Sequence, residues 1–580
     1  MCGLFGHLIS ESWSITHSRK ALHTLTHRGP DQWGEWQGAR VYMGHRRLSI
    51  LDLSEKGRQP MTDGAGDVVI TVNGEIYNYP RLRAELESRH EFRSRSDSEV
   101  VVHGYKEWGI EGLLDRLDGM YALVVYDRAQ DRLYLARDRA GIKPLYYALV
   151  DGVFAWASEL KAIREYFGSN RLKVDLTALY DFLTYMYVPA PKSLYCDVYK
   201  LEPGHYAAFD CGSRQLKVAS YWRLDCTEQA IGLADAEREL VRLVDQSVQE
   251  QLMSDVPVGV FLSGGMDSSI VAESANRASR HIQTFTIQVM DPALDESPFA
   301  RLLAEHAGTD HHVRACGAED ANEWIGRLHD WYDEPFADSS AIPTHLVSRF
   351  SRERVVVALS GDGGDELFGG YRWYSAMEER ARRGIQGWPA LRLWTARGKR
   401  WLGRSLAGRV VRRLEFDHVL GDLEYYTRLM GGLLPEDKSA YAREWEIDPE
   451  YDDFWYFRKF WRPDLPLQTR LQYLDFHTYL PDDILTKVDR ASMQVALEVR
   501  VPLLSRALIE FAFSLPETIR YANGQLKGLM KSAFQTRLPQ AILAKPKQGF
   551  NLPLKAWKMA DGRMASYQQR ILHLYYSSHL

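Results

Sequence analysis

The strongest constraint on the fold is an alternation of short apolar strands, polar loops and helices that begins near residue 258. Strands are predicted at residues 258–262, 284–289 and 355–359, a loop at 263–269, and helices at 270–278 and 298–307. Such alternation predicts a parallel sheet covered by helices, an α/β domain. After residue 378 the pattern becomes mainly helical, so a helical C-terminal part is expected to follow the sheet.

The first 160 residues have a different pattern, rich in strands with short turns. Strands are predicted at residues 67–77, 121–127, 133–138, 145–149 and 153–157, and an early helix at 18–25. The last four strands form two pairs with short polar connections, which is the pattern of a β-hairpin. This part is therefore predicted to be an α+β domain made of strand-rich layers and a few helices.

Two domains are expected, because 580 residues exceed what one hydrophobic core usually holds. An amphipathic helix at 234–252, with apolar residues at helical spacing, opens the second domain. We assign residues 2–210 to the first domain and 235–580 to the second, with the boundary between 200 and 234.

Composition argues against several classes of protein. The formal net charge of −5 gives no reason to expect nucleic acid as a main partner. The arginines between Arg380 and Arg413 are interpreted as a solvated helix face. Five cysteines without a CxxC pair or zinc spacing fit a reducing cytosol. The sequence has no signal-peptide pattern and no run of about 18 apolar residues, so we predict a cytoplasmic protein without a membrane partner.

The second residue is a cysteine that could serve as a nucleophile. An incidental thiol near a chain end is the plainer alternative. If Met1 is removed, however, the thiol of Cys2 lies next to a free α-amine whose ordinary pKa is about 7.7–8.0. That amine can act as the adjacent general base, so Cys2 would carry its own base.

Attack on an amide also requires donors for the oxyanion and a clamp for the charged end of the substrate. Asn73 and Gly74 end an apolar run, where a side-chain amide and a backbone N–H can point at one oxygen. Taken alone, this pair is more often a turn. Arg28, Arg47 and Asp97, taken singly, are typical of solvated surface residues.

Two loops after predicted strands combine glycines, hydroxyls and carboxylates. The first, SGGMDSS at 263–269, opens a helix, whose N–H groups and serine hydroxyls can bind an anion. A glycine-rich turn with a serine cap is the alternative, but Asp267 beside phosphates requires a shared cation such as Mg²⁺. No GxxxxGK[ST] loop occurs.

The second loop, SGDGGDE at 360–366, places Asp362, Asp365 and Glu366 at the end of another strand. A solvated acidic turn is the simpler interpretation. Open parallel sheets bind ligands at the carboxyl ends of their strands, so both loops are expected at one edge. We therefore predict a second segment of the same Mg²⁺ and nucleotide site.

Five motifs near the N-terminus resemble the class II glutamine amidotransferase domain: MCGLFG at 1–6, HRGPD at 27–31, RLSILD at 47–52, NGEIYN at 73–78 and SDSE at 96–99. The resemblance implies an N-terminal-nucleophile fold, a four-layer αββα sandwich. It also implies these roles: nucleophile for Cys2, oxyanion hole for Asn73 and Gly74, binding of the glutamine α-carboxylate for Arg47, and a position near the α-amine for Glu75 and Asp97.

The SGGMDSS loop resembles the signature of the ATP-pyrophosphatase fold, which cleaves ATP between the α and β phosphates. DDILTKVDRASM at 482–493, EVRVPLL at 498–504 and KQGFNLPL at 547–554 extend the resemblance to glutamine-hydrolysing asparagine synthetases over nearly the whole chain. It implies Mg²⁺ at Asp267 and Asp365, and Lys527 as the catalytic lysine, with Lys531 the weaker candidate. The implied ATP- and pyrophosphate-binding residues are Leu262, Ser263, Gly264, Gly265, Asp267, Ser268, Ser269, Ser360, Gly361 and Asp362.

The implied enzyme is an ATP-dependent carbon–nitrogen ligase with two half-reactions. Cys2 hydrolyses glutamine, and an internal channel of small and apolar residues conducts the ammonia to a carboxylate that Mg–ATP has adenylated. The products are an amide, glutamate, AMP and pyrophosphate. Aspartate is the expected acceptor, and the oligomeric state stays open, with a homodimer among the options.

Three features keep the identity of the acceptor open. Asp362 stands where well-studied asparagine synthetases have glutamate, and DEPFADSSAIPT at 333–344 resembles relatives from polysaccharide and secondary-metabolite gene clusters. The chain also stops 23 residues after Trp557, earlier than that branch leads us to expect. A sugar uronate of surface polysaccharide is the main alternative acceptor.

Other kinds of protein are less favoured. A β-lactam synthetase typically lacks the N-terminal cysteine, and a catalytically dead nucleotide-binding regulator would have a damaged Cys2 or Asp267. A tRNA-modifying relative of the ATP domain would need no glutaminase domain. Both Cys2 and Asp267 are intact, and both sets of motifs occur in one chain.

Overall fold

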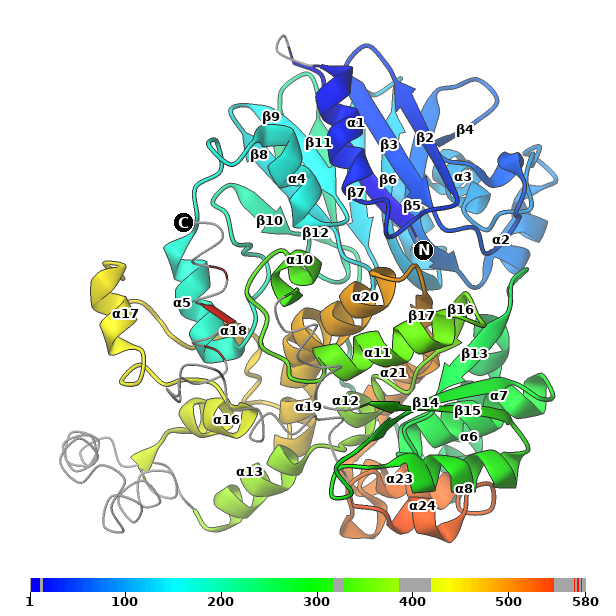
Figure 1. The fold of residues 1–580 in the computed structure, drawn as a ribbon, viewed down its shortest axis with the longest axis vertical. Coiled ribbons are helices and arrows are strands. Elements are labelled where there is room, and N and C mark those ends of the chain that lie inside the picture. The colour runs from blue at the N-terminus through cyan, green and yellow to red at the C-terminus, as the bar shows by residue number, and fades with distance from the viewer. Residues whose placement is uncertain are drawn as a thin grey trace.

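The computed structural model describes residues 2–10, 14–316, 327–384 and 419–546, together with Gln568, Ile571, Leu572 and Tyr575. The KQGFNLPL segment at 547–554, Trp557 and the arginines from 392 to 413 lie outside the described residues. Figure 1 shows a strand-rich unit, in blue and cyan, above a second unit of helices and strands, in green to orange.

The first unit stacks two antiparallel sheets of six strands each. The first sheet has the order β10 (Val198–Lys200), β8 (Tyr146–Val150), β9 (Val153–Ala157), β1 (Cys2–Leu8), β3 (Val41–Arg47) and β2 (Gln32–Gln37). The second has the order β12 (Gln215–Ser220), β11 (His205–Asp210), β7 (Arg132–Arg137), β6 (Gly119–Asp127), β5 (Val68–Ile76) and β4 (Met61–Thr62). Apolar side chains from both sheets, such as Leu4 and Val124, form one core between them.

Helices cover the outer faces of both sheets. They are α1 (Ile15–His23) and α4 (Leu160–Phe167) on the first sheet, and α2 (Tyr79–Leu86) and α3 (Glu99–Arg116) on the second. The predicted αββα sandwich is therefore confirmed, and the two predicted hairpins are β6–β7 and β8–β9. The early helix begins at Ile15 rather than at residue 18, because Ser14 has an extended backbone and marks the residue before the first turn.

The first unit continues beyond residue 210, the limit drawn from the sequence. Strand β12 (Gln215–Ser220) pairs with β11 along its whole length, so it belongs to the second sheet. The next helix, α6 (Leu233–Gln251), packs in the second unit. We therefore propose that the first unit extends to Ser220 and that residues 221–232 connect the two units.

The second unit is built on a parallel sheet of five strands, as the alternation of strands and helices predicts. Its order is β15 (Asp310–Cys316), β14 (Gln283–Val289), β13 (Val258–Phe261), β16 (Val357–Leu359) and β17 (Glu498–Arg500). One face is covered by α6, α7 (Met266–Ala278) and α8 (Ser297–Ala307). The other is covered by α11 (Ala341–Arg352) and α20 (Thr486–Met493).

Helix α7 begins at Met266, four residues before the start that the sequence suggested. Gly265, with φ −79° and ψ 160°, is the last extended residue before the helix. The loop after β13 is therefore shorter than predicted, and Asp267, Ser268 and Ser269 belong to the first turn of the helix.

The C-terminal part is mainly helical where it is described, as predicted. Its helices, with those that precede it after β15, are α10 (Leu328–Tyr332), α12 (Gly364–Phe368), α13 (Arg372–Arg382), α16 (Asp422–Met430), α17 (Ser439–Glu444), α18 (Trp455–Phe460), α19 (Leu467–His477), α21 (Arg506–Ser514), α22 (Glu517–Arg520), α23 (Gly528–Ala533) and α24 (Gln540–Ala544). A π-helical turn at Leu480–Leu485 leads into α20. In the first unit, α5 (Leu176–Tyr185) leaves the sandwich and packs against α16. Over the described ranges, none of the helices combines the length and apolar character needed to cross a bilayer.

Candidate active site

The first candidate centre lies at the start of β1, where Cys2 is fixed at both ends of its backbone. The nitrogen of Cys2 donates a hydrogen bond to Oδ1 of Asn73 at 2.8 Å. Its carbonyl oxygen accepts a hydrogen bond from Nε of Arg28 at 3.0 Å. In the pairing of β1 with β3, Cys2 lies opposite Arg47, so two predicted site residues share one register position.

The thiol of Cys2 is buried, and burial raises its pKa, although the backbone at Leu48 and the charge of Arg47 act in the opposite direction. A thiol with a raised pKa is mostly protonated at neutral pH and is a weak nucleophile. Attack by Cys2 therefore needs a base close to the sulfur, which an α-amine on the same residue can supply.

One half of the Asn73 side-chain amide is bonded and the other half is not. It lies fully buried on β5, and its Oδ1 is taken by Cys2. Its Nδ2 has no hydrogen-bond partner among the described residues. An unsatisfied buried donor is costly, by about 1–3 kcal/mol, so this N–H group is suited to an oxygen that arrives with the substrate.

Gly74 allows β5 to approach β6 closely at the same point. Its φ is +152°, and a Cβ atom added there would lie 1.9 Å from the carbonyl oxygen of Met120. Any side chain would push the strands apart beside Asn73. The structure thus places Asn73 against Cys2, with Gly74 as the next residue of β5.

Arg47 is buried and held by neighbouring acceptors. Its Nη1 donates to Oε1 of Gln32 at 2.7 Å, and its Nη2 donates to the carbonyl oxygens of Leu51 at 2.9 Å and Asp52 at 2.7 Å. These bonds fix the guanidinium beside Cys2. A positive charge in a fixed position is what a carboxylate clamp requires.

Glu75 and Asp97 form a buried acidic pair. Oδ2 of Asp97 accepts a hydrogen bond from the backbone nitrogen of Ile76 at 2.7 Å. Burial raises the pKa of Glu75 well above its usual range, and the carboxylates of Asp97 and Glu498 raise it further. A substrate cation between these carboxylates would relieve that repulsion.

The second candidate centre is a cavity of about 530 Å³ at the carboxyl ends of β13, β14 and β16. Its volume lies within the range of about 300–1,000 Å³ that is typical of small-molecule sites. The predicted residues that line it are Leu262, Ser263, Gly265, Asp267, Ser268, Ser360, Gly361, Asp362, Asp365 and Lys527. As expected from the sequence, the two glycine-rich loops meet at one edge of the sheet.

Two residues of the first loop lie away from the cavity. Ser269 is fully buried inside α7 and is not on the cavity wall. Gly264 has φ +71°, and a Cβ atom there would lie 2.5 Å from the backbone nitrogen of Ala300. Because Gly264 has no side chain, the loop can pack against α8, which is a structural role.

Lys527 lies between the two carboxylates that the sequence assigned to a metal. Its Nζ forms ion pairs with Oδ2 of Asp267 and with Oδ1 of Asp365, the latter at 2.5 Å. One cation can therefore contact both carboxylates at once. Two carboxylates that converge in this way, beside a glycine-rich loop predicted to bind phosphates, fit Mg²⁺, which is usually held by one or two carboxylates and substrate phosphates. The described part of the chain contains no cluster of three or more His, Cys, Asp and Glu residues arranged around a metal.

Lys487 and Tyr371 also line the cavity, beside Glu366 of the second loop, and neither of these two residues was predicted to belong to the site. Nζ of Lys487, on α20, donates to Oδ2 of Asp338 at 2.9 Å. The hydroxyl of Tyr371 donates to Oε1 of Glu366 at 2.5 Å. Burial, and next the charge of Asp365, raises the pKa of Glu366 to about 8. Lys487 stands in a motif quoted for the resemblance, but nothing in its spacing pointed to the cavity.

Comparisons with known proteins match a family to each of the two units. The family described as Asparagine synthase matches residues 239–578, and the family described as Glutamine amidotransferase domain matches residues 1–222. The chain is 31% identical over 571 residues to asparagine synthetase (glutamine-hydrolyzing) 1 of Bacillus subtilis, covering 96% of this chain and 88% of that protein.

Two further relatives differ in their names. A putative asparagine synthetase (glutamine-hydrolyzing) of Mycobacterium tuberculosis is 33% identical over 567 residues, covering 93% of this chain and 84% of that protein. Amidase chry2 of Gibberella zeae is 27% identical over 604 residues, covering 93% of this chain and 85% of that protein. The names of these relatives do not agree on a single reaction product.

Proposed function

Because this chain belongs to the asparagine synthase family, we propose that it transfers the amide nitrogen of glutamine to aspartate and makes asparagine. The enzyme is an ATP-dependent ligase that hydrolyses glutamine. The residue roles given below and the identity of the acceptor are our proposal. The observation that carries the proposal is the pairing, in one chain, of a buried Cys2 beside an unsatisfied Asn73 amide with a nucleotide-sized cavity lined by Asp267 and Lys527.

In the first half-reaction, the sulfur of Cys2 attacks the side-chain amide carbon of glutamine. Once Met1 is removed, the α-amine of Cys2 takes the thiol proton and returns a proton to the leaving nitrogen, which departs as ammonia. The N–H groups of Asn73 and Gly74 donate to the oxyanion that forms. Water then cleaves the γ-glutamyl thioester and releases glutamate. Arg47 binds the α-carboxylate of glutamine, while Glu75 and Asp97 bind its α-ammonium.

In the second half-reaction, the acceptor carboxylate attacks the α-phosphorus of ATP and pyrophosphate leaves. The resulting acyl-adenylate is attacked by ammonia, which displaces AMP and forms the amide. Serine hydroxyls and N–H groups at the start of α7 bind the phosphates. Lys527, which lines the same cavity, donates to the departing pyrophosphate. The ammonia passes between the two units.

Asp267 and Asp365 are the residues that would hold Mg²⁺ beside the phosphates. When bound, Mg²⁺ neutralises charge that develops on the phosphate oxygens. Lys527, whose Nζ pairs with the same two carboxylates, would donate to the phosphate oxygens beside such a metal.

The proposal is tested by identifying the amide product by mass spectrometry, with glutamine, ATP and a panel of carboxylates that includes aspartate and sugar uronates. Wild-type protein is expected to form asparagine from aspartate. Cys2→Ala should lose glutamine hydrolysis but keep synthesis with ammonia, because Cys2 serves only the first half-reaction. Amidation of a uronate and not of aspartate would overturn the acceptor and leave the reaction class in place.

Asp362 supports a second test of the acceptor. Ser360 Oγ donates to Oδ2 of Asp362 at 2.5 Å, which holds the carboxylate on the cavity wall. Asp362→Glu adds one methylene, worth about 1–3 kcal/mol in a packed pocket. If aspartate is the acceptor, the longer side chain should keep or improve kcat/KM for aspartate, measured with ammonia as nitrogen donor. If a larger sugar acid is the acceptor, the same change should crowd the pocket and lower turnover.

A further inference from the structure

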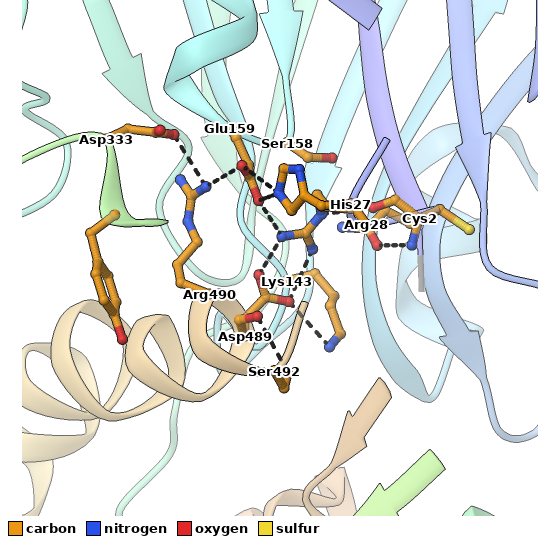
Figure 2. A network of polar contacts seen from close by, with 12 residues as sticks. Cys2, His27, Arg28, Lys143, Ser158, Glu159, Asp333, Asp489, Arg490 and Ser492 are labelled. Atoms are coloured by element: carbon orange, nitrogen blue, oxygen red, sulfur yellow. Dashed lines mark hydrogen bonds and ion pairs between the residues drawn. The ribbon is translucent and has the colours of Figure 1, made fainter. Parts of the chain in front are cut away.

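A buried network of ion pairs beside Cys2 connects the first unit with the second (Figure 2). Arg28 and Glu159 belong to the first unit, and Asp489 and Arg490 lie on α20 of the second. The side chains of Arg28 and Glu159 are completely buried, and those of Asp489 and Arg490 are 2% and 1% exposed. Lys143 and Lys161 add positive charge, and Asp333 adds negative charge.

Arg28 is the residue through which this network reaches Cys2. Its Nε donates to the carbonyl oxygen of Cys2 at 3.0 Å. Its Nη1 and Nη2 donate to the two oxygens of Asp489 at 2.8 and 3.1 Å, a two-pronged contact. A guanidinium is planar and rigid, so the plane set by Asp489 also sets the direction of Nε.

The surroundings of Asp489 favour its charged form. Burial alone would raise its pKa, but the positive charges of Arg28 and Lys143 hold the pKa below its usual range. Glu159 also accepts a hydrogen bond from Nη1 of Arg28 at 2.7 Å, but it is shared with His27, Lys161 and Arg490. Asp489 is therefore the carboxylate that binds both terminal nitrogens of Arg28.

We propose that Asp489 is a positioning residue of the glutamine-hydrolysing centre, supplied by the other catalytic unit. It orients Arg28, and Arg28 holds the backbone carbonyl of the nucleophile, while Asn73 holds the backbone nitrogen. This inference rests on the proposed role of Cys2. Small displacements of a reacting group reduce rates strongly, so the glutaminase centre is complete only when α20 lies against the first unit.

Asp489 lies on the same helix, α20, as two residues of the nucleotide cavity. Lys487 and Val488, the two residues before it, line the nucleotide cavity. Helix α20, eight residues long, therefore lines the cavity with Lys487 and Val488 and binds Arg28 with the next residue, Asp489. A substrate that shifts α20 at the cavity would also move the carboxylate that orients Arg28.

The test compares Asp489→Asn with Asp181→Asn in the full-length protein. Both changes remove one charge from a buried, ion-paired carboxylate; Asp181 pairs with Lys192 at 2.7 Å and contacts neither centre. Asp489→Asn is expected to lower kcat for glutamine hydrolysis about tenfold to a hundredfold, because the nucleophile loses its orientation. The KM for glutamine should stay near the wild-type value, because the clamp residues are untouched. Ammonia-dependent pyrophosphate release should also stay unchanged in both variants.

A double variant shows whether Asp489 acts through Arg28. Arg28→Lys removes the two-pronged contact, so adding Asp489→Asn to it should cause little further loss of kcat, since residues in one network are not additive. Alkylation of Cys2 by a chloroketone analogue of glutamine gives a direct readout: the rate should fall in Asp489→Asn and stay at the wild-type value in Asp181→Asn.

Three results would overturn the inference. The first is wild-type glutamine hydrolysis and Cys2 alkylation in Asp489→Asn. The second is an equal loss of both half-reactions in that variant, which would indicate a purely structural contact. The third is additive losses in the double variant. Failure of the proposed function would give a different result, because glutamine hydrolysis would then persist in the Cys2→Ala variant.

Discussion

Asn73 illustrates how a single side chain acquires a function from its surroundings. Its amide oxygen is occupied by the nitrogen of Cys2 at 2.8 Å, which fixes the orientation of the whole amide. The amide nitrogen is buried and has no hydrogen-bond partner among the described residues, so its N–H groups are left to donate to a ligand. The side-chain N–H group of Asn73 is therefore an unpaired donor beside Cys2, from which an oxyanion can accept a hydrogen bond.

Replacing Asn73 by alanine is expected to lower kcat for glutamine hydrolysis by about 10²–10³-fold, the usual loss when one oxyanion donor is removed. Ammonia-dependent synthesis should remain, because the second cavity is unchanged. Glutamate release and pyrophosphate release would be measured on the same preparation. Asn78→Ala is a matched control, since its amide donates to the carbonyl oxygen of Arg116 on the surface. A wild-type glutaminase rate in Asn73→Ala would exclude this role.

Residue types and their order indicated Cys2, Asn73 and the two loops, because thiols, amides and glycine-rich carboxylate loops have limited chemistry. Asp489, Lys487 and Arg500 were not predicted to be neighbours of these centres. Their positions depend on long-range contacts: Arg28 and Asp489 are 461 residues apart. Ser269 shows the opposite case, since a motif suggested a phosphate ligand, and the first turn of α7 places its side chain in the core.

At the scale of one element, the residue at which a helix starts decides where the side chains of its first turn lie. The early start of α7 at Met266 places Asp267 in the first turn, where its carboxylate faces Lys527. The strand pattern was predictable because buried parallel strands are short, apolar runs. The helix start was not, because Gly265 ends the extended segment through its backbone conformation, and Met, Asp and Ser are compatible with both loop and helix.

Asp267→Asn is expected to abolish ATP-dependent pyrophosphate release while basal glutamine hydrolysis continues. The variant loses one of the two carboxylates proposed to hold Mg²⁺ and also releases Lys527 from its ion pair. Raising the Mg²⁺ concentration should restore part of the activity if metal binding is what was weakened. Asp310→Asn, on the exposed surface of β15, serves as a control of equal charge change. Unchanged pyrophosphate release would contradict the assignment.

A single carboxylate joins three helices of the C-terminal part. Asp475 of α19 is fully buried and accepts hydrogen bonds from Trp373 at 3.0 Å and Tyr374 at 2.6 Å, both on α13, and from Tyr426 on α16. Burial raises the pKa of Asp475 from 3.8 to about 6, although these three donors act to lower it. The folded protein therefore keeps a proton there that the unfolded chain has already lost.

This raised pKa predicts how stability depends on pH. Because the folded-state pKa is the higher one, the stabilising contribution of Asp475 is complete below pH 3.8 and is lost as the pH rises through about 6. Asp475→Asn removes this contribution. Between pH 5 and 7.5, the free energy of unfolding of wild type should fall by about 1.4 kcal/mol relative to the variant. Urea unfolding at several pH values measures the difference, and parallel pH profiles of the two proteins would contradict it.

At the scale of the whole molecule, the two units are joined by charged residues on both sides of Cys2. Asp489 reaches Arg28, and Arg500 of β17 reaches Glu75, which we propose binds the α-ammonium of glutamine. Nη2 of Arg500 lies 3.6 Å from Oε2 of Glu75. The same side chain donates from Nε to Glu498 at 2.6 Å and from Nη1 to the carbonyl oxygens of Gln251 and Met253. The backbone of Arg500 accepts a hydrogen bond from Ser360, the first residue of the second nucleotide loop, at 2.8 Å.

Arg500 is therefore expected to support glutamine binding from the second unit. Arg500→Met removes the charge that counteracts the raised pKa of Glu75, so Glu75 should hold its proton more strongly and bind the α-ammonium of glutamine less well. The KM for glutamine should rise about tenfold, which corresponds to about 1.4 kcal/mol. Arg500→Lys keeps the charge and should raise KM less. Ammonia-dependent synthesis should survive in both variants, since the hydrogen bond to Ser360 comes from the backbone of residue 500. Steady-state kinetics with glutamine and with ammonia separates these effects. Equal losses of activity with both nitrogen donors would mean that Arg500 only holds the sheet together. An increase in KM that is confined to glutamine, and is larger in Arg500→Met than in Arg500→Lys, would mean that the second unit completes the glutamine site of the first.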